Sequence, residues 1–314
     1  RQVLTRLRKS VLVTSTGAST RIEGSELSDE DVEKLMRGLS LKRFKSRDAQ
    51  EVQGYYELLT NVFNSYQSTP FSEGTIKFFH RELLQHAEKD TQHRGEDKKK
   101  ENRVEMVNIA GDSVGVLFAT TPAYLTGKEM LELVEWTQQA IIERKIHPLI
   151  IIGNFIVEFL SIHPFEDGNG RLSRILTNLL LLQQGYAYMP YISHEKIIEN
   201  NKAEYYLALR QSQRTFRLQN NDMTPWMRFF LNVLLNQSKQ ALDLLAHAQT
   251  EQLLSPQQEL VWKNIPQTGT ATPSEIALAA GVPRPTVNQA LQKLMRLKMI
   301  ERIGSGRSTR YKKK

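Results

Sequence analysis

Two strongly apolar segments on either side of a short polar loop are the feature that most constrains how this chain can fold. Residues 149–162 read LIIIGNFIVEFLSI, and residues 172–185 read LSRILTNLLLLQQG. The first segment is too short to span a bilayer and contains Asn154 and Glu158, so we predict a buried core helix. The second is also a strongly apolar helix, and Gly185 marks its end. No membrane partner is expected.

Most of the remaining chain is predicted to be helical, with one exception. In residues 1–90, apolar residues recur at three- and four-residue spacing, and Ser28 followed by acidic residues is typical of a helix start. Residues 93–122 break this pattern: a charged stretch precedes two β-prone segments, 104–109 and 114–119, with Gly111 and Gly115 near the turn. This pattern predicts a β-hairpin. Residues 98–100, all lysines, are predicted to be a solvated loop.

The net charge of the chain is concentrated at its C-terminal end. The whole sequence carries a formal charge of +8, and residues 255–314 alone hold 11 Lys and Arg against 3 Asp and Glu. The other residues are therefore balanced, and a length of 314 residues suggests about two domains. Such asymmetry predicts a polyanionic partner for the tail.

The basic tail is predicted to contain two helices and a hairpin. Ser274, followed by Glu275, is predicted to cap the first helix, Gly281 and Pro283 make a turn, and residues 284–297 form the second helix. A hairpin with residues 304–306 at its tip would follow. This order resembles a winged helix-turn-helix.

In that resemblance the second helix would enter the major groove and the wing would touch the backbone. The side chains expected on the base side are Thr286, Asn288, Gln289 and Gln292. Those expected to meet phosphate are Arg284, Arg307, Arg310 and the terminal lysines. Because the fold is also a common protein–protein module, dimerisation or target docking is the alternative.

The loop between the two apolar helices reads HPFEDGNGRLSR over residues 163–174. Its glycines permit a close backbone approach, and the free N–H groups of the outgoing helix make an anion cradle. Arg171 and Arg174 are three residues apart and so lie on one helical face. Two guanidinium groups beside such a cradle suit a phosphate chain.

Two further residues of this loop suit nucleotide chemistry. Asp167 is a hard oxygen ligand that fits Mg²⁺, which usually takes one or two carboxylates and completes its shell with phosphate and water. His163 titrates near neutrality and can accept a proton from an attacking hydroxyl. Together, the cradle, the metal ligand and the base predict transfer of a nucleotide phosphate.

The segment from His163 to Arg171, with Arg174 following, resembles the complete signature of the Fic (filamentation induced by cAMP) family. Members typically transfer AMP from ATP to a hydroxyl side chain of a target protein. The resemblance implies that His163 is the general base, that Asp167 holds Mg²⁺ and that Arg174 meets the γ-phosphate of ATP. The residues it implies for holding the nucleotide phosphates are Gly168, Asn169, Gly170, Arg171, Leu172 and Ser173.

Two other segments are similar to parts of the same family. Residues 93–106 resemble the lead into a flap hairpin that docks the target by strand addition. Residues 204–209, EYYLAL, resemble the helix on the nucleotide side, where Tyr205 or Tyr206 would stack on adenine. Plain core packing is the alternative for both tyrosines.

The stretch STRIEG, residues 19–24, resembles the inhibitory signature of Fic proteins that carry the inhibitory helix before the core. The signature residues are Ser19, Glu23 and Gly24. The resemblance implies that Glu23 pairs with Arg174 and occupies the γ-phosphate position, so that ATP binds in a pose unsuited to attack on its α-phosphate. In some members the same glutamate helps to reverse the reaction.

The expected fold class is therefore mainly α: a Fic-type helical bundle with a β-hairpin flap, followed by a C-terminal winged helix-turn-helix domain. The expected regions are an N-terminal helical region with the inhibitory helix (1–90), the catalytic core (91–215), connecting helices (216–254) and the winged domain (255–314).

The expected function is that of a protein adenylyltransferase that uses ATP and Mg²⁺ and is autoinhibited by Glu23. The alternatives are a nucleotide-sensing, DNA-binding regulator and a Fic-type transferase with a different donor. The candidate partners are a target protein, DNA through residues 255–314, and a second copy of the chain. The absence of cysteine and of a recognisable leader predicts a cytoplasmic protein.

Overall fold

The computed structural model of this chain describes residues 2–38, 46–107, 113–215, 218–304, 306 and 309–313. The chain divides into two compact units, Arg1–Ala241 and Leu242–Lys314. The helix α10 (Thr224–Leu253) starts in the first unit and continues into the second. Each unit has its own hydrophobic core.

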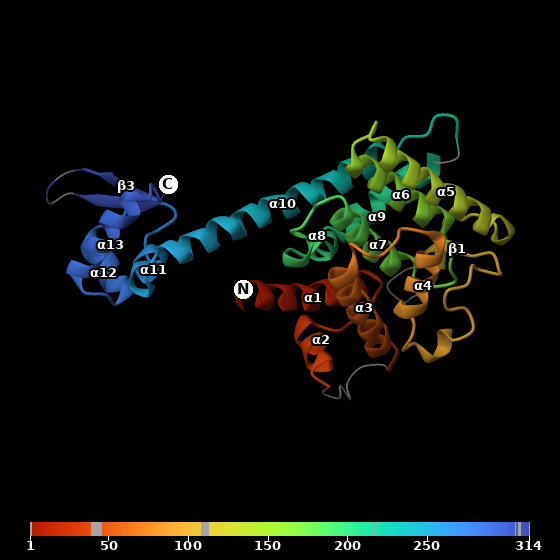
Figure 1. The fold of residues 1–314 in the computed structure, drawn as a ribbon, viewed down its shortest axis with the longest axis horizontal. Helices are drawn as coiled ribbons and strands as arrows, with labels where there is room; N and C mark the ends of the chain where they lie inside the picture. Colours follow the sequence, from red (N-terminus) through yellow and green to blue (C-terminus); the bar gives the residue numbers. More distant parts are fainter. Residues whose placement is uncertain are drawn as a thin grey trace. The chain divides into compact units, whose positions relative to one another are not determined.

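The first unit is a bundle of helices with one two-stranded sheet (Figure 1). Besides the start of α10, its helices and strands are α1 (Gln2–Ile22), α2 (Asp29–Met36), α3 (Ser46–Ser65), α4 (Glu73–Leu83), β1 (Arg103–Val107), β2 (Ser113–Ala119), α5 (Ala123–Glu143), α6 (Pro148–Ile162), α7 (Asn169–Gln183), α8 (His194–Asn200) and α9 (Lys202–Thr215). Short 3₁₀ turns lie at Glu88–Asp90 and Met189–Tyr191. The mainly helical fold class is confirmed.

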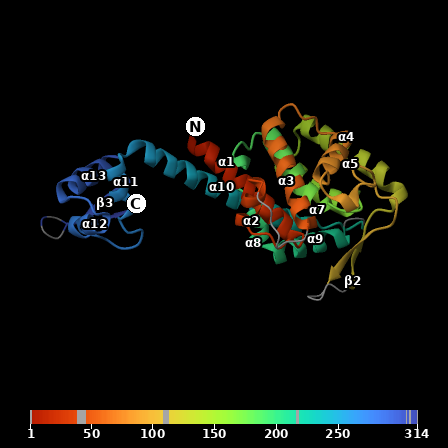
Figure 2. The same ribbon diagram turned by 90° about the horizontal axis from the view of Figure 1, so that it is seen from below.

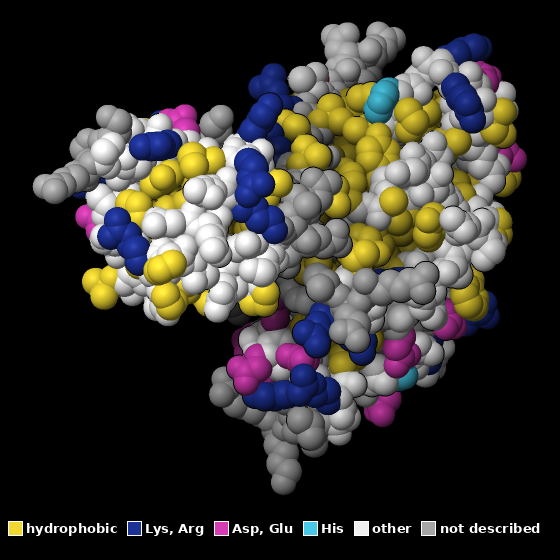
Figure 3. All heavy atoms as spheres, turned by 60° about the vertical axis from the view of Figure 1, so that its left-hand side comes forward, with side chains coloured by type: hydrophobic (Ala, Val, Ile, Leu, Met, Phe, Trp, Pro, Cys, Tyr) yellow, Lys and Arg dark blue, Asp and Glu magenta, His cyan; other side chains and the backbone are white. Residues whose placement is uncertain are grey.

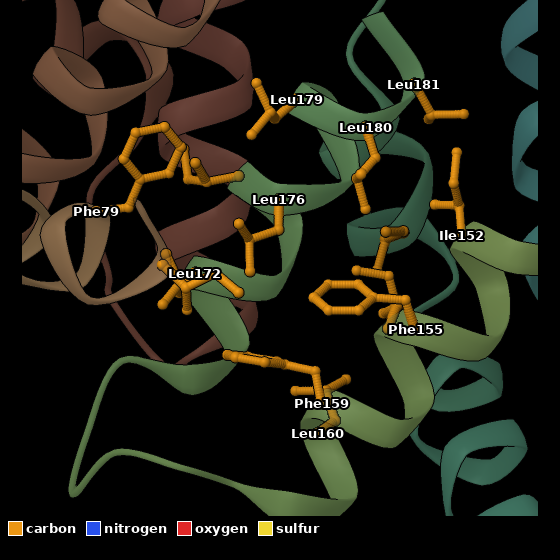
Figure 4. Packing of buried hydrophobic residues seen from close by; sticks show 14 of the residues in the cluster. Phe79, Ile152, Phe155, Phe159, Leu160, Leu172, Leu176, Leu179, Leu180 and Leu181 are labelled. Atoms are coloured by element: carbon orange, nitrogen blue, oxygen red, sulfur yellow. The ribbon is translucent and has the colours of Figure 1, made fainter. Parts of the chain in front are cut away.

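The helix α7 lies at the centre of this unit. It is buried along nearly its whole length, and α6 packs against it. Figure 4 shows Phe155 and Phe159 of α6 next to Leu172 and Leu176 of α7, with Phe79 of α4 on the other side. The two apolar segments of the sequence are therefore the buried central helices that their composition predicts.

Local sequence signals explain how these helices begin and end. The predicted cap at Ser28 is present as a capping box, in which Ser28 and Asp31 each accept from the other's backbone N–H. The helix α6 ends at His163 and α7 begins after Gly168, and both residues adopt positive φ (53° and 80°). These two turns fold the polar loop back onto the central helices.

The predicted hairpin is present as an antiparallel pair. The strand β1 pairs with β2 from Arg103 opposite Ala119 to Val107 opposite Ser113, with two register shifts between them. Residues 108–112, which include Ile109 and Gly111 of the expected turn, lie outside the described residues.

The helix α1 packs against α3 and α8, and Figures 1 and 2 both draw it beside them. The side of α1 that faces the bundle is unusually polar for a buried surface. Ser15, Thr16, Ser19 and Thr20 are all at most 1% exposed. Buried polar groups require partners, so these residues indicate that α1 takes part in a polar network inside the unit.

The second unit has the order of a winged helix. Its elements after α10 are α11 (Pro256–Lys263), α12 (Pro273–Ala280), α13 (Arg284–Arg296), β3 (Ile300–Ile303) and β4 (Arg310–Lys313). The strand β3 is antiparallel to β4, and Ala271 forms a bridge with Tyr311. The core includes Ile276, Leu291 and Ile300.

One predicted cap in this unit is wrong. The residue that caps α12 is Thr272, which forms a capping box with Glu275, whereas Ser274 lies inside the first turn. Pro273 explains the difference, because proline is favoured as the first residue of a helix and so places the cap one residue before itself.

Among the described residues, no helix combines the length and the apolar character that a bilayer crossing requires.

A close helix contact gives a test of this packing. A methyl group built on Gly54 of α3 would lie 2.1 Å from the carbonyl oxygen of Leu83 at the end of α4. Because that oxygen belongs to the backbone, we expect Gly54→Ala to lower the free energy of unfolding by about 1–3 kcal/mol. At Gly127 of α5 the methyl group would meet Asp97 Oδ2 at an ordinary 3.5 Å. Gly127→Ala should leave the stability unchanged or raise it. Urea-induced unfolding compares the two variants, and equal losses would contradict this description.

Candidate active site

A cavity of about 310 Å³ lies between the loop that follows α6, the start of α7 and one face of α9. Residues far apart in the sequence line it together. They are Glu23, Leu160, His163, Glu166, Asp167, Gly168, Asn169, Gly170, Arg171, Tyr205, Tyr206, Leu209, Arg210 and Gln213. Three of the other candidate residues, Leu172, Ser173 and Arg174, are not among the lining residues and are buried in α7.

The backbone of the loop is held from the segment that precedes β1. Lys98 donates its backbone N–H to the Pro164 carbonyl (2.8 Å) and its ammonium group to the Ile162 carbonyl (3.0 Å). Asn102 donates its side-chain amide to the Phe165 carbonyl (3.0 Å). A buried loop needs partners for its backbone groups, and these two residues supply several of them.

Lys98 is a correction to the sequence analysis. It was expected in a solvated loop, but it is 3% exposed, and its ammonium group also donates to Asn102 Oδ1 and Thr120 Oγ1, both at 2.8 Å. Lys99, whose side chain is 73% exposed, does fit that expectation. Three adjacent lysines carry no local signal that tells the buried one from its neighbours.

His80 of α4 also holds the loop, and sequence reasoning missed it. Its ring stacks on Phe165, with 3.8 Å between the ring centroids and 8° between the planes. Its Nε2 lies 3.0 Å from the Asp167 carbonyl oxygen, and its Nδ1 accepts from the Gly95 N–H (2.8 Å). Burial lowers the pKa of His80 to about 4. Its place among the apolar residues of α4 was a usable signal, because a histidine in such a position usually has a specific partner.

The start of α7 can bind an anion, and an internal carboxylate lies beside it. The first hydrogen bond of the helix runs from the Leu172 N–H to the Gly168 carbonyl (2.8 Å), so the N–H groups of the residues between them point out of the helix end. A methyl group built on Gly170 would lie 2.2 Å from Glu23 Oε1. The Glu23 carboxylate therefore lies directly against this first turn, where the helix dipole favours negative charge.

The same carboxylate pairs with Arg174, one turn further along α7. Glu23 Oε1 accepts from Arg174 Nη2 (2.7 Å), and Ser19 accepts from the same guanidinium through Oγ (2.7 Å) and its carbonyl (3.0 Å). Arg174 is 2% exposed. Burial opposes its charge, but the nearby Glu23 carboxylate raises the pKa of Arg174 above its usual value. The structure thus brings Ser19, Glu23 and Arg174 into one contact.

The end of α1 places Glu23 there. Gly24 adopts a φ of 101°, which glycine tolerates and which turns the chain away after the helix. Two side chains of α9 bind the last carbonyls of α1: Lys202 donates to Arg21 and Tyr206 donates to Ile22, both at 3.2 Å. The helix that lines one side of the cavity therefore also holds the segment that carries Glu23.

Asp167 is ionised and already pairs with arginines. Its Oδ2 accepts from Arg47 (2.9 Å) and Arg171 (3.0 Å), and its Oδ1 accepts from the Gly168 N–H (2.6 Å). Burial opposes this charge, but Arg171, the Gly168 amide and Arg47 keep the pKa of Asp167 below its usual value. The second ion pair of Arg171 is with Glu51, at 2.7 Å.

These contacts fit a single-carboxylate Mg²⁺ site rather than a cage of protein ligands. No group of three or more His, Asp or Glu residues able to hold a metal occurs in the part of the chain that the structure describes. The Asp167 side chain is 38% exposed and lies at the cavity beside the anion site. Mg²⁺ suits such a place, because it commonly takes one protein carboxylate and completes its shell with phosphate oxygens and water.

His163 lies at the opposite end of the loop and also lines the cavity. Burial lowers its pKa to about 4, and the Lys98 ammonium adds to this effect. No described residue forms a hydrogen bond with its Nδ1. The imidazole is therefore neutral at physiological pH, the state that can accept a proton.

The two tyrosines of α9 differ in their surroundings. Tyr205 is 3% exposed and packs against Trp226 and Phe229, so it belongs to the core as well as to the cavity wall. Tyr206 is 37% exposed. Of the two, Tyr206 has the ring surface that a nucleobase could reach.

Two family models match this chain. The Fic/DOC family model matches residues 70–181, which hold α4, the hairpin, α5, α6 and most of α7. The chain carries a domain of the Fic/DOC family. The loop with His163 and Asp167 lies within this Fic domain, whereas Glu23 and the two tyrosines of α9 lie outside the matched residues.

Known proteins are similar to parts of the chain or to its fold. A Fido domain-containing protein of Dictyostelium discoideum is 37% identical over 92 residues, which are 29% of this chain and 60% of that protein. The protein adenylyltransferase Fic of Culex quinquefasciatus is 32% identical over 106 residues, 34% of this chain and 18% of that protein. The chain therefore spans less than two thirds of the length of either relative. The crystal structure of a Fic family protein from Desulfovibrio desulfuricans has a TM-score of 0.63 at 24% identity and covers 98% of this chain and 88% of that one, a likeness of fold.

The second match is at the C-terminal end. Residues 255–314 match the family model described as "Sugar-specific transcriptional regulator TrmB", which agrees with the winged-helix fold. Figure 3 shows Lys and Arg side chains on the face of this unit that the view presents. On α13, Asn288, Gln289 and Gln292 are exposed and Thr286 is half-buried.

Several basic residues of this unit bind within it. Arg284 donates to Ser274, Lys312 pairs with Glu301 (2.7 Å), and the Lys313 ammonium lies 4.5 Å from the centroid of the Trp262 ring. Arg310 lies 3.8 Å from Glu275. Arg307 and Lys314, two other candidates for phosphate contact, lie outside the described residues.

The role of Lys98 can be tested by comparison with its neighbour. Lys98→Met keeps the apolar stem but leaves buried oxygens of Asn102, Thr120 and Ile162 without this donor. We expect it to lower the free energy of unfolding by about 1–3 kcal/mol. Lys99→Met changes an exposed side chain and should stay within about 0.5 kcal/mol of the parent. Urea-induced unfolding measures both, and a Lys98 variant as stable as the Lys99 variant would contradict this role.

Proposed function

We propose that this chain transfers AMP from ATP to a hydroxyl side chain of a target protein, and that Glu23 holds it in an inactive state. One observation supports this proposal above all: the neutral His163, the ionised Asp167 and the N-terminal turn of α7, which suits an anion, line the same cavity. The similarity to a protein named as an adenylyltransferase supports the choice of AMP.

In this reaction the hydroxyl oxygen of the target attacks the α-phosphorus of ATP. The bond from that phosphorus to the oxygen bridging to the β-phosphate breaks, and pyrophosphate leaves. His163 would accept the hydroxyl proton, since its imidazole is neutral at physiological pH. His163 lines the same cavity as Asp167 and Gly170, which supports this role.

The phosphates would lie along the start of α7. Gly170 of its first turn and Arg171 line the same cavity as Glu23, and the N–H groups of a helix start suit an anion. Asp167 would hold Mg²⁺, exchanging its contacts with Arg47 and Arg171 for the ion. Bound there, Mg²⁺ would neutralise charge on the phosphate oxygens.

Glu23 would block this arrangement in two ways. Its carboxylate lies against Gly170 in the first turn of α7, and it pairs with the Arg174 guanidinium that the resemblance assigns to the γ-phosphate. Two anions cannot share that place, so ATP would bind with its phosphates displaced from in-line geometry. Small displacements of reacting atoms can lower a rate by about 100-fold.

The first test is Glu23→Gly. We expect AMP transfer, measured with ATP labelled in its adenosine or α-phosphate and with a host lysate, to rise by about 10–100-fold. Glu26→Gly, which removes an exposed glutamate three residues later, is the matched control and should leave transfer unchanged. Adding His163→Ala to Glu23→Gly should abolish labelling.

Other results would decide between the alternatives. Equal labelling by the parent and by Glu23→Gly would remove autoinhibition from the proposal. No labelling by either protein would favour a nucleotide-sensing role. The mass added to a modified target, read by mass spectrometry, identifies the donor, and a mass other than that of AMP would point to a transferase with a different donor.

A second candidate function is binding of DNA through the winged unit. The excess of positive charge in residues 255–314 and the exposed amide side chains of α13 favour it. Such side chains can bind base edges in the major groove. The match to a transcriptional regulator model supports the same function.

We expect the full chain to bind a duplex selected from a random pool, with an affinity that falls steeply as salt rises. Gln289→Ala together with Asn288→Ala should reduce the preference for the selected duplex over random DNA by about 10-fold or more. Lys239→Ala, on the part of α10 in the first unit, should leave that preference unchanged. Electrophoretic mobility shifts at two salt concentrations measure this. Absence of a selected sequence, with the winged unit folded, would favour its use as a protein–protein module.

A further inference from the structure

Both ring nitrogens of His80 form hydrogen bonds, one with the loop of residues 163–174 and one with Gly95, and these partners determine where the proton of the ring lies. The Gly95 N–H can only donate, so Nδ1 accepts (2.8 Å). The Asp167 carbonyl can only accept, so Nε2 carries the proton and donates to it (3.0 Å). Only the neutral ring protonated at Nε2 satisfies both bonds.

His80 contacts the peptide unit between Asp167 and Gly168, and the carbonyl and the N–H of this unit each form one hydrogen bond. Its carbonyl belongs to Asp167 and accepts from His80, while its N–H belongs to Gly168 and donates to the Asp167 carboxylate (2.6 Å). Because the peptide is planar, fixing the carbonyl also fixes the direction of the N–H. The hydrogen bond from His80 therefore orients the carboxylate of Asp167 through one rigid group.

The same peptide leads into α7. Gly168 is the residue before the helix and adopts a φ of 80°, and a methyl group built on it would lie 3.6 Å from the His80 ring. The ring also stacks on Phe165. His80 thus contacts the loop at residues 165, 167 and 168, where the direction of the first helical N–H groups is set.

We propose that His80 is a positioning residue for the nucleotide. Its Nε2–H fixes the orientation of the peptide between Asp167 and Gly168. In that orientation, the Asp167 carboxylate and the first-turn amides of α7 face the phosphates. His80 does not contact the reacting atoms itself. The inference rests on the proposed function for its ligand, ATP, and it predicts a defect in nucleotide binding that is separate from any loss of folding.

Two substitutions separate the two nitrogens. The side-chain amide of Asn matches the position of Nδ1, so His80→Asn can keep the Gly95 contact but has no donor near the Asp167 carbonyl. The amide of Gln reaches the position of Nε2, so His80→Gln can keep that donor. In the Glu23→Gly background we expect His80→Asn to weaken binding of ATP with Mg²⁺ by about 10-fold or more, and to lower kcat as well. His80→Gln should bind within about threefold of the parent.

Isothermal titration calorimetry with ATP and MgCl₂ gives the affinity, labelled-ATP transfer gives kcat, and thermal unfolding gives Tm. His86→Asn, at a half-buried histidine that pairs with Glu57 away from the loop, is the control and should match the parent in affinity. ATP affinity in His80→Asn equal to that of the parent would overturn the proposal. Equal losses in the Asn and Gln variants that follow their losses of Tm would also overturn it, since they would indicate a role in packing alone.

The experiment also separates this proposal from the proposed function. If the Glu23→Gly protein binds ATP but labels no target, AMP transfer fails, and His80 is judged by ATP affinity alone. If His80→Asn does not fold, ¹⁵N spectra of histidine-labelled parent protein decide. A ring protonated at Nε2 and not at Nδ1 supports the proposal, and the opposite tautomer overturns it.

Discussion

A guanidinium group buried on the central helix is the constraint on which the rest of the first unit depends. Arg174 is 2% exposed, and an unpaired charge in such a place costs several kcal/mol. In the part of the chain that the structure describes, the end of α1 supplies three of its acceptors: the hydroxyl and carbonyl of Ser19 and the carboxylate of Glu23. The central helix therefore needs α1 beside it, and α1 is part of the folded bundle rather than an added cover.

A second buried charge, the carboxylate of Glu195, is linked to the middle of α1 by hydrogen bonds. Glu195 of α8 is 1% exposed and accepts from Tyr55, Asn178 and Ser193, at 3.1, 2.7 and 3.1 Å. Ser15 of α1 donates to the Ser193 hydroxyl (2.8 Å). Burial opposes the charge of Glu195, but the neighbouring His194 and hydrogen bonds that include those of Ser15 and Asn178 keep its pKa below its usual value. Two charges inside the bundle, one on α7 and one on α8, thus explain why Ser19 and Ser15 are buried on the inner face of α1.

The sequence was informative where the chemistry is local and uninformative where it depends on tertiary contacts. The apolar segments predicted the central helices, and the glycines around Asn169 predicted a tight turn before a helix, because each signal lies within a few residues. The residues that hold the turn, His80, Lys98 and Asn102, lie more than 60 positions before it. The residues next to them in the sequence do not indicate which groups they contact. The pairing of Glu23 with Arg174 was predicted from a family resemblance, since no periodicity or spacing relates residues so far apart.

The two contacts that α1 makes with Arg174 differ in how easily they break. Ser19 lies inside the helix and is fully buried, whereas the Glu23 side chain is 32% exposed and follows the last helical residue. If the Glu23 carboxylate turns away, Arg174 keeps both hydrogen bonds to Ser19, so its guanidinium is not left without acceptors. Undocking α1 would instead remove the Ser19 and Glu23 acceptors from Arg174 and also the Ser15 contact near Glu195. Opening of the anion site therefore needs only a local rearrangement between Ile22 and Gly24, where Lys202 and Tyr206 of α9 bind the end of the helix.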